Sequence, residues 1–419
     1  MTNSSQTLDV IIVGARVAGS AAAIMLARSG LRVLVVDKAG FPSDTISTHI
    51  VLAGGTQVLG RIGALDWLER AGGVRFARMR TVGPGFDYRA ELRTEGEDLR
   101  GLCLGRARMD AAMIDLARSF NSVAVRENFR VDDLVVEDGA IAGIRGEDET
   151  GIREFRAPLV VGADGMRSTV AKIAEQRIGA FKRADVPCAR AYYYSYYEGV
   201  RADRIGDELI TEFEASPGAG DLVCRCEDGR VVAAVAFDAN EMQSFRTGLA
   251  ANLGRHLTES LAVGGLLKDA TMIGKVFSSG LLLNTYRVPV ADGALLLGDA
   301  GLHVDPLFGQ GHSLALMSAE IFGQLAPDWF AARDGNTISA AAMAPFAERR
   351  DAALMRYYRA SERASAELML DRGTLLAHRA AKHEQWAADE MVRFAQMAPQ
   401  RIFPSLRFAR LMALEARGA

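Results

Sequence analysis

Short, continuous apolar runs recur along the chain, and each ends at a glycine or an aspartate. The run Asp9–Val13 precedes Gly14, and the run Arg32–Val36 precedes Asp37. A strand that is buried on both faces reads as a continuous apolar run, so each run predicts a strand of a parallel sheet. The alanine-rich segment between them, Ser20–Ser29, predicts a helix that a glycine ends. Together these segments predict a strand–helix–strand unit that opens at residue 9.

Two later apolar runs have the same form. The run Leu159–Gly162 leads into Asp164-Gly165, and the run Ala294–Leu297 leads into Gly298-Asp299. Each predicts a buried strand that ends in a turn, and we expect the second to deliver Asp299 to a crevice beside the first strand. Thr48 is a candidate cap for a helix that runs to about Gly60. We further expect helices over Ala111–Arg118 and Ser313–Gln324, and a hairpin over Val131–Ile144 that turns at Asp138-Gly139.

From about residue 181 to residue 288 the pattern changes to alternating polar and apolar positions. This period of two predicts strands of a mainly antiparallel second domain. One helix, Asn240–Leu261, interrupts the strands, and residues 331–419 read as helical. The predicted strands are Ala189–Glu198, Leu209–Glu214, Leu222–Cys226 and Val231–Phe237.

Composition narrows the class of protein. Hydrophobic residues make up 49% of the 419 residues and the net charge is −3, which is ordinary for a soluble globular enzyme and leaves no basic field for nucleic acid. No apolar run approaches the ~18 residues of a membrane span, and the polar N-terminus lacks the features of a signal peptide. We therefore expect a cytoplasmic protein of two domains without an integral membrane segment.

The first strand–helix–strand unit has the features of a dinucleotide site. Gly14 makes a tight turn after the first strand, and the next helix begins near Ala18. The free N–H groups and the positive dipole end of that helix favour a pyrophosphate. Asp37 ends the second strand, where a carboxylate accepts the hydroxyls of an adenosine ribose and repels a 2′-phosphate. The alternative is a glycine turn of a doubly wound sheet without a nucleotide.

Two arginines bear on this site. Arg16 stands where the G-x-G-x-x-G fingerprint has its second glycine, which lets the backbone approach the phosphates. Its side chain either meets the pyrophosphate or a substrate anion, or it points to solvent. Arg106 begins an Arg-x-x-Met-Asp pattern ahead of a helix. It is a candidate contact for a pyrophosphate or a flavin edge, and the alternative is an exposed arginine at a helix start.

A second segment, far along the chain, complements the first. Asp299 is placed to hold a ribityl hydroxyl, and Gly309-x-Gly311 allows a close backbone approach before the helix that starts near Ser313. The N-terminus of that helix faces the position where a reduced flavin carries negative charge, and His312 would add to this effect if protonated. The two segments together indicate FAD.

Histidines and cysteines supply further candidates. His49, His303 and His312 are candidates to tune a flavin, with a hydrogen-bonded structural role as the alternative for each. Cys224 and Cys226 share one face of a predicted strand. For these two, packing is the expected role, and no metal site is predicted.

Tyrosines crowd one predicted strand. Tyr192, Tyr194 and Tyr196 share one face by the period of two. They are candidates for an aromatic-lined pocket that takes a flat polycyclic substrate. The alternative is core packing against the helix predicted over Asn240–Leu261.

Three motifs, in their order and spacing, resemble those of the flavoprotein monooxygenases of the para-hydroxybenzoate hydroxylase type. That superfamily also holds flavin-dependent halogenases and geranylgeranyl reductases. The motifs are the N-terminal fingerprint, Gly162-Ala-Asp164-Gly165-x-Arg167-Ser168, and Gly298-Asp299, and the Arg106 pattern matches a fourth, weaker signature. The resemblance covers roughly the first 180 residues and residues 285–330.

The resemblance implies FAD as the cofactor, NAD(P)H as a transient reductant and O2 as a co-substrate, without a second nicotinamide-binding domain. Asp164 then organises the FAD-binding fold and a transient nicotinamide site. The expected catalytic residues are His312, His49 and Pro306, and the expected substrate-binding residues are Tyr192, Tyr194 and Tyr196. The expected cofactor-binding residues are Gly14, Ala15, Arg16, Ala18, Gly19, Asp37, Lys38, Thr48, Arg106, Asp164, Asp299, Gly309, Gly311, His312 and Ser313.

The implied fold is α/β. A Rossmann-like FAD-binding domain, three-layered around a parallel sheet, is interleaved with a mainly antiparallel β substrate domain, and helices follow at the C-terminus. We expect the FAD-binding domain over residues 1–75, 101–180 and 286–330, the substrate domain over 76–100 and 181–285, and the helical region over 331–419. These last helices are candidates for a lid or a homodimer face, with a solvated surface as the alternative.

The chain departs from the family pattern at several points. Arg16 replaces a glycine, as in a subgroup with Phe-Pro-Ser-Asp-Thr-x-Ser-Thr-His after the second strand, which this chain has at Phe41–His49. The usual Gly-Asp-Ala-Ala-His becomes Gly-Asp-Ala-Gly-Leu-His, which displaces the histidine to His303. The Trp-x-Trp-x-Ile-Pro motif of tryptophan-type halogenases and the Tyr-x-Trp-x-Phe-Pro signature of geranylgeranyl reductases do not occur.

The resemblance therefore predicts an FAD-dependent monooxygenase, either a hydroxylase or an epoxidase. It implies oxygen transfer through a flavin C4a-hydroperoxide to a small aromatic or polyketide-like natural product. Three alternatives stay open: a flavin-dependent reductase of prenyl double bonds, a flavin-dependent halogenase, and a flavin-binding protein that stabilises a pathway intermediate without oxygenase turnover. Arg16 is the only feature that favours the last of these.

Overall fold

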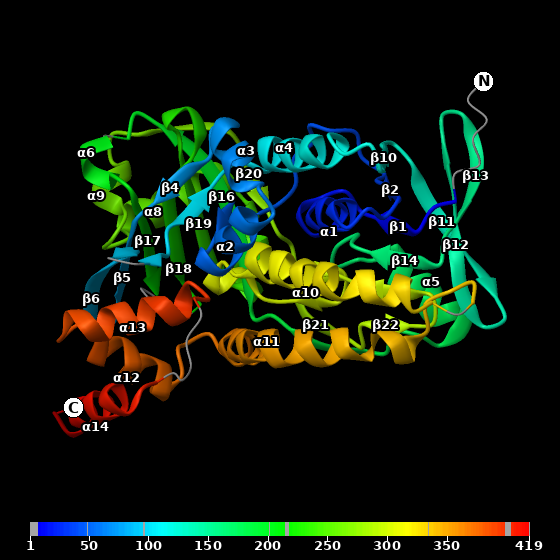
Figure 1. Cartoon of the computed structure of the whole chain (residues 1–419). Helices are drawn as coiled ribbons and strands as arrows, with labels where there is room; N and C mark the ends of the chain where they lie inside the picture. Colours follow the sequence, from blue (N-terminus) through cyan, green and yellow to red (C-terminus); the bar gives the residue numbers. More distant parts are fainter. Residues whose placement is uncertain are drawn as a thin grey trace.

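The computed structural model describes residues 7–47, 49–94, 97–200, 202–213, 218–333, 335–398 and 404–418. Figure 1 shows two sheet-containing halves side by side, with the long helices α10 (Gly311–Ala331) and α11 (Ala340–Ala366) running from the middle of the molecule beneath the right-hand half. The chain crosses between the halves several times, so segments distant in sequence share each half.

A six-stranded sheet carries the predicted parallel strands. Its order is β10-β2-β1-β14-β23-β22, and every neighbouring pair is parallel except β22 and β23. Val13 pairs with Val36 on one side and Gly162 on the other, so these strands end at the same edge of the sheet. The strands are β10 (Val123–Arg126), β2 (Val33–Val36), β1 (Val10–Val13), β14 (Leu159–Gly162), β23 (Ala294–Leu296) and β22 (Val290–Ala291).

This sheet is the middle of three layers. Alternate side chains of β1, such as Val10 and Ile12, pack into a core with α1 (Val17–Arg28), α4 (Arg106–Arg118) and α10. The side chains between them pack on the other face against α5 (Thr169–Ile178) and a small antiparallel sheet. That sheet consists of β11 (Arg130–Glu137), β12 (Ala140–Asp148) and β13 (Gly151–Arg156). The predicted three-layer α/β arrangement and the hairpin at Asp138-Gly139 are confirmed.

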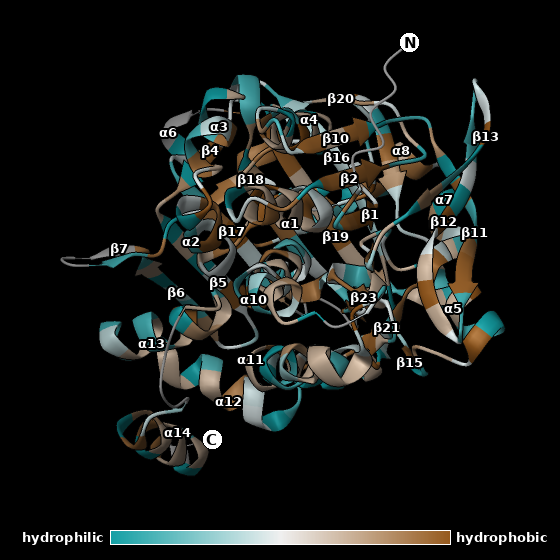
Figure 2. Ribbon diagram, turned by 45° about the vertical axis from the view of Figure 1, so that its right-hand side comes forward, coloured by the Kyte–Doolittle hydropathy of each residue, from teal (hydrophilic) through white to brown (hydrophobic). Residues whose placement is uncertain are grey.

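A seven-stranded sheet forms the other half, in the order β20-β16-β19-β18-β17-β5-β6. Its pairs are antiparallel except β17 with β5, which confirms the mainly antiparallel second sheet. In Figure 2 the strands of both large sheets are largely brown, as expected for buried apolar strands. The strands are β20 (Thr271–Ser278), β16 (Arg190–Glu198), β19 (Val231–Asp238), β18 (Gly220–Arg225), β17 (Glu208–Phe213), β5 (Arg78–Gly83) and β6 (Phe86–Glu91).

The single helix predicted over Asn240–Leu261 is wrong. The structure has two helices there, α7 (Met242–Arg246) and α8 (Leu249–Glu259), because Gly248 between them takes a positive φ of 91°. That left-handed conformation suits glycine and ends a right-handed helix. A third short helix, α9 (Gly264–Leu267), follows before β20.

The helices of the C-terminal region cover one face of the seven-stranded sheet. Leu354 and Tyr357 of α11 belong to the same apolar core as Leu209 and Val232 of that sheet. Three more helices follow in the C-terminal region: α12 (Arg372–Ala381), α13 (Gln385–Ala395) and α14 (Leu406–Gly418). Figure 1 places α14 at the outer edge of this group.

Short elements connect the two halves. Three small sheets consist of β3 (Ile50–Val51), β9 (Gly101–Cys103) and β4 (Val74–Phe76); β15 (Arg183–Pro187), β21 (Leu283–Arg287) and β24 (Leu302–His303); and β7 (Arg93–Thr94) with β8 (Glu97–Asp98). The remaining helices are α2 (Ala53–Arg61), α3 (Leu65–Arg70) and α6 (Ala202–Ile205). The predicted cap of α2 at Thr48 lies outside the described residues, and Leu52 is the residue at the N-cap of that helix.

Candidate cofactor site

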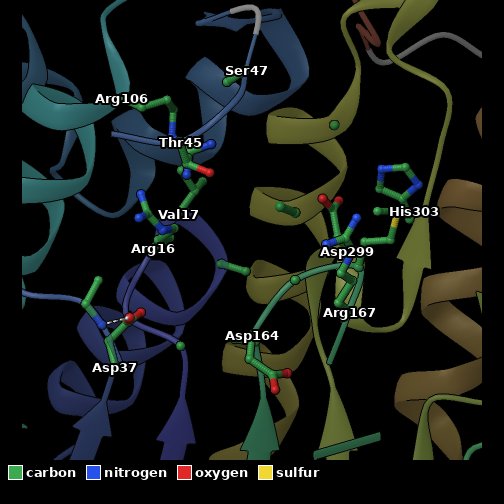
Figure 3. A pocket seen from close by; sticks show the side chains of 18 of the residues that line it. Arg16, Val17, Asp37, Thr45, Ser47, Arg106, Asp164, Arg167, Asp299 and His303 are labelled. Atoms are coloured by element: carbon green, nitrogen blue, oxygen red, sulfur yellow. Dashed lines mark hydrogen bonds between the residues drawn. The ribbon is translucent and has the colours of Figure 1, made fainter. Parts of the chain in front are cut away.

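A cavity of about 460 Å³ opens where the parallel strands end. Gly14 follows β1, Asp37 follows β2, Asp164 comes after β14 and Asp299 comes after β23, and all four line the cavity. Figure 3 shows Asp37 at one end and Asp299 with His303 at the other, with the turn at Arg16 and Val17 between them. Ligands of open α/β sheets bind in such a crevice outside the carboxyl ends of the strands.

The turn after β1 needs its glycines. Gly14 has a φ of 104°, and a Cβ atom there would lie 2.3 Å from the carbonyl oxygen of Ala163. A Cβ at Gly19 would lie 1.8 Å from the carbonyl oxygen of Gly14. These approaches pack the first turn of α1 directly against the strand ends. Because no side chain caps α1, its first N–H groups stay available for an anion in the cavity.

Asp37 is held in place by two backbone groups. Its side chain accepts hydrogen bonds of 2.8 Å from the N–H groups of Ala15 and Ala39, and the residue is 8% exposed. Each carboxylate oxygen keeps a second lone pair, which is what a ribose diol requires. Lys38 and Ala18 line the cavity beside it, whereas Ala15 contributes its backbone N–H.

The side chain of Arg16 lies at the cavity, where Asp110 and Ser43 hold it. Its guanidinium lines the cavity and forms an ion pair with Asp110 of α4, a carboxylate that is fully buried. It also donates to the hydroxyl oxygen of Ser43 at 2.9 Å. Arg106 pairs with the same Asp110 at 2.9 Å. The interpretation of Arg16 as a solvated side chain is therefore wrong, because a buried acid holds it at the cavity.

Asp164 accepts hydrogen bonds from the first turn of α5 with one carboxylate oxygen, and its other oxygen has no partner among the described residues. Its Oδ2 accepts hydrogen bonds from the N–H groups of Thr169 and Val170, at 2.6 and 3.2 Å. Its Oδ1 is buried without a partner among the described residues. Burial raises the pKa of this carboxyl, although the hydrogen bonds from Ser168 and the backbone oppose the shift. The residue lines the cavity, but this unpaired oxygen is buried and is not exposed to it.

Gly298, after β23, lies in close contact with α1 and α10. Gly298 has a φ of 53°, and a Cβ there would lie about 3.1 Å from that of Ala18 and 3.2 Å from that of Ala315. Asp299 follows and lines the cavity, half-buried. A Cβ at Gly309 would lie 2.5 Å from Ile50, whereas one at Gly311 would meet no protein atom within 4 Å. The first turn of α10 therefore leaves open space on its cavity side.

His312 is neutral at physiological pH. Burial and the positive charge of Arg106 lower its pKa to about 3. Its Nδ1 lies 2.9 Å from the carbonyl oxygen of Ile50 and therefore donates, so its Nε2 accepts from the hydroxyl of Ser47 at 3.2 Å. His312 lines the cavity as predicted but adds no positive charge to the helix end.

His49 sits between the cavity loop and the antiparallel sheet. It is fully buried with a φ of 65°, its Nε2 lies 2.5 Å from the hydroxyl of Tyr196, and its Nδ1 has no partner among the described residues. Burial lowers its pKa to about 3, and the positive charges of Arg106 and Arg230 contribute to the same shift. His49 does not line the cavity itself, whereas His303 does.

The three predicted tyrosines lie on the sheet face opposite α8. Tyr193 and Tyr197, the residues between them, pack with Leu253 and Leu257 of α8. The alternative of packing against that helix is therefore wrong for Tyr192, Tyr194 and Tyr196. The hydroxyl of Tyr192 donates to Asp305, and its ring lines a second cavity of about 30 Å³.

Tyr194 and Tyr196 have packing partners. The ring of Tyr194 stacks on Phe277 with centroids 4.6 Å apart, and the ring of Tyr196 stacks on His49 at 5.4 Å. Neither lines either cavity. Ser313 likewise lies away from the cofactor cavity, since its hydroxyl oxygen accepts from the N–H of Leu52 at 3.0 Å.

Sequence reasoning missed several residues of the cavity. Asp110 is the last residue of the Arg106 pattern, but nothing in that pattern predicts its ion pair with Arg16. Ser47 and Thr45 lie in the loop motif at Phe41–His49, whose conspicuous composition was a usable signal. Arg167, two positions after Gly165, lines the cavity and is labelled beside Asp299 in Figure 3.

The predicted packing role of the cysteines agrees with the structure. Cys224 and Cys226 are buried in one apolar core with Cys103. Within the described ranges, no group of three His, Cys, Asp or Glu side chains is arranged for a metal ion. In the same part of the chain, no helix combines the length and apolar character that a bilayer crossing requires.

The groups that line the cavity fit FAD. A carboxylate at one end suits the adenosine ribose, and the open first turn of α1 suits the pyrophosphate. Asp299 and the unobstructed glycine at the start of α10 suit the ribityl chain and the ring. A model of the FAD binding domain matches residues 7–324. The chain belongs to the FAD-binding domain family. It is therefore a member of a family of FAD-binding oxidoreductases, as the motifs predicted.

Relatives with different reactions share this family. Digeranylgeranylglycerophospholipid reductase 2 of Methanothermobacter thermautotrophicus is 28% identical over 326 residues, which is 76% of this chain and 78% of that protein. The 6-methylpretetramide 4-monooxygenase of Streptomyces rimosus is 27% identical over 327 residues, 74% of this chain and 73% of that protein. The relatives therefore include both reductases and monooxygenases.

Solved structures confirm the fold. A flavoprotein/dehydrogenase from Cytophaga hutchinsonii superposes with a TM-score of 0.81 at 16% identity, and the match covers 99% of this chain and 100% of that one. A flavin-dependent brominase superposes with a TM-score of 0.75 at 16% identity, over 99% of each chain. The α/β fold with a Rossmann-like FAD-binding half and a second, mainly antiparallel half is thereby confirmed.

Proposed function

We propose that this protein is an FAD-dependent monooxygenase that oxygenates a small aromatic or polyketide-like natural product. The observation that carries the proposal is the cofactor cavity, whose lining suits FAD, together with the similarity to the 6-methylpretetramide 4-monooxygenase over 74% of the chain. A second, small cavity lies behind Pro306. Pro306 lines both this cavity and the cofactor cavity, so it stands at the boundary between them. Besides Pro306, the second cavity is lined by Tyr192, Thr211, Glu212, Phe213, Gly220, Asp221, Leu222, Ala234, Val235, Ala236 and Leu307.

The second cavity is small. Its volume of about 30 Å³ has room for about one or two water molecules and not for a whole substrate. Tyr192 and Phe213 line it where the antiparallel sheet meets Pro306. Pro306 is thus proposed to act at the boundary between cofactor and substrate.

The neutral state of His312 bears on the alternative of alkene reduction. When bound, a reduced flavin supplies the activation of O2 and the transfer of one oxygen atom. Saturation of an alkene requires a proton donor in addition to a hydride. His312 cannot serve as that donor, because its Nδ1 proton is held by the Ile50 carbonyl and its Nε2 is an acceptor. Its role is to hold Ser47 and the loop in place at the cavity.

We also propose a reductant, a cellular location and an oligomeric state for this protein. NAD(P)H is the reductant, and Arg167 and Asp164 at the cavity are candidates for its transient contact. The four cysteines are free and buried, in agreement with a cytoplasmic location. A homodimer through the C-terminal helices is supported by the exposed Leu406 and Leu414 of α14. The oligomeric state in solution tests this last point.

A flavin-dependent reductase of prenyl double bonds is the second candidate. It is favoured by the similarity to the digeranylgeranylglycerophospholipid reductase, which extends over 76% of the chain. A halogenase and a flavin-binding protein without turnover are further outcomes of the same experiment. The halogenase predicts a product that depends on added halide.

The test measures NAD(P)H oxidation and O2 consumption together, with a panel of phenols, polyketide aromatics and prenyl compounds. The proposal predicts substrate-stimulated NAD(P)H oxidation with equal O2 consumption and a product that is heavier by one oxygen atom. Anaerobic turnover with a prenyl substrate would instead establish the reductase and overturn the proposal. A Tyr192→Phe variant keeps the cavity volume nearly unchanged and provides a matched protein for comparison of product profiles.

A further inference from the structure

The residue that breaks the fingerprint has a defined set of partners. Arg16 pairs with Asp110, donates to the Ser43 hydroxyl oxygen at 2.9 Å and to the Ser43 carbonyl oxygen at 3.4 Å. Its guanidinium also lies over the ring of Phe41, 5.5 Å from the centroid. The side chain is 26% exposed, whereas that of Asp110 is fully buried. One arginine thus joins the turn after β1, helix α4 and the loop after β2.

That loop is an extended segment with one face turned inward. Phe41, Ser43, Thr45 and Ser47 are half-buried, while the residues between them are exposed. Such alternation is the period-two pattern of an extended chain. Thr45 and Ser47 of the inward face line the cofactor cavity, and the exposed Ile46 between them also borders it. The segment therefore forms a wall of that cavity.

Each inward position has a partner on a different part of the fold. Ser43 accepts from Arg16, the carbonyl of Thr45 accepts from the hydroxyl of Tyr194 at 3.5 Å, and Ser47 donates to His312. The wall is thus attached to the fingerprint turn, to the antiparallel sheet and to α10. The N–H of Phe41 also donates to the carboxylate of Glu127 at 2.6 Å, so the loop has charged partners at two points, Arg16 and Glu127.

We propose that Arg16 is a positioning residue that pins the loop Phe41–Ser47 over the cofactor cavity and so tightens FAD binding. A glycine at this position, as the fingerprint has, leaves the loop without this attachment. Arg16 and the loop motif Phe41–His49 then act together, since the guanidinium of Arg16 needs the hydroxyl oxygen of Ser43 as its partner. This inference rests on FAD binding alone and not on the proposed oxygenation.

Because Arg16 and Arg106 share the carboxylate of Asp110, Arg16 also affects the net charge at the cavity. Two guanidiniums, those of Arg16 and Arg106, face the one carboxylate of Asp110, so one positive charge is left over at the cavity. Arg106 lies close enough to His312 to depress its pKa, which places that charge toward the α10 end of the cavity. If Arg16 is removed, Asp110 neutralises Arg106. The leftover charge then disappears, and an anionic reduced flavin loses stabilisation.

The experiment compares purified holoproteins that carry Arg16→Ala, Arg16→Lys, Ser43→Ala, and Arg16→Ala with Ser43→Ala. The first measurement is the dissociation constant of FAD, from the flavin released on serial dilution. We expect Arg16→Ala to raise it about 10- to 100-fold, because charge-assisted hydrogen bonds are lost. Ser43→Ala raises it about two- to fivefold in the wild-type background and adds nothing in the Arg16→Ala background, since contacting residues are not additive.

The second measurement is the midpoint potential of the bound flavin, which a merely structural role would not move. Arg16→Ala should lower it, and a tenfold loss of preference for the reduced form corresponds to about 30 mV for a two-electron couple. Arg16→Lys keeps the charge, so its potential should stay near that of the wild type while FAD binding weakens through loss of the fork. Arg28→Ala, at the far end of the same helix, is the control and should leave both values unchanged.

Two results would overturn the proposal. One is an Arg16→Ala protein with the FAD affinity and potential of the wild type. The other is a Ser43→Ala effect of equal size with and without Arg16. If Arg16→Ala does not fold, Arg16→Lys and Ser43→Ala decide, because each alters the Arg16–Ser43 contact: wild-type FAD affinity in both of them would then overturn the proposal.

Discussion

Replacement of His312 by asparagine should flatten the acid side of the stability profile. The folded state lowers the pKa of His312 from 6.5 to about 3, so folding favours its neutral form. The stabilisation is complete above pH 6.5 and is lost as the pH falls toward 3. At pH 5, which lies 1.5 units below the unfolded value of 6.5, the loss amounts to about 2 kcal/mol at 1.36 kcal/mol per unit.

The assay is urea unfolding at pH 5, 6, 7 and 8 with FAD at one fixed excess. Asparagine keeps a donor for the Ile50 carbonyl but has no titrating group. Between pH 7 and pH 5 the wild type should therefore lose about 2 kcal/mol more unfolding free energy than His312→Asn. Equal losses in the two proteins would refute the assignment of a neutral, buried imidazole.

His256 supplies a control of opposite sign. Burial alone would lower its pKa, but the hydrogen bond and charge of Asp221 outweigh burial and raise it. Its contribution to stability is therefore present below the unfolded pKa and is lost as the pH rises through the folded pKa. The unfolding free energy of His256→Asn should differ most from that of the wild type at pH 5, whereas His312→Asn should differ least there.

Four further substitutions have defined outcomes. Asp37→Ala should weaken FAD binding about 10- to 100-fold in a flavin titration, since it removes the ribose acceptor and the anchor of the Ala15 and Ala39 N–H groups; unchanged affinity would place the adenosine elsewhere. Gly311→Ala should fold with an unchanged or higher melting temperature, because its Cβ meets no protein atom within 4 Å, but it should bind FAD more weakly. Gly14→Ala should fail to fold, because its Cβ would lie 2.3 Å from the carbonyl oxygen of Ala163. The reverse order of melting temperatures would contradict this. Tyr192→Phe should lower the unfolding free energy by about 1 to 3 kcal/mol at pH 7, since it leaves the buried Asp305 carboxylate with one partner fewer, and a fully retained stability would show that this hydrogen bond is not formed.

The parallel half was predictable because its signals are local. The strands β1, β2, β14 and β23 are buried on both faces, so their sequences are unbroken apolar runs. The residues that follow such strands must meet at one edge of the sheet, which is why Asp37 and Asp299 could be assigned to one site. The glycine requirement at Gly14 likewise follows from a turn between neighbours in sequence.

The contacts that complete the site were not predictable from local pattern. Asp110 lies 94 residues from Arg16, and only the packing of α4 against α1 brings the two together. The face of β16 that carries Tyr192 was identified correctly, but the side on which α8 packs depends on the connection around the sheet. The break at Gly248 was hidden because glycine within an apolar helical pattern is often tolerated.

The most direct test of the central claim is the visible absorption spectrum of the purified protein, with an FAD titration of any flavin-free fraction. The two segments at Gly14 and Asp299 form one FAD cavity in this structure. We therefore expect a yellow protein that holds about one FAD per chain and loses it when Asp37 or Asp299 is replaced by alanine. A colourless protein that also fails to bind added FAD would contradict the account.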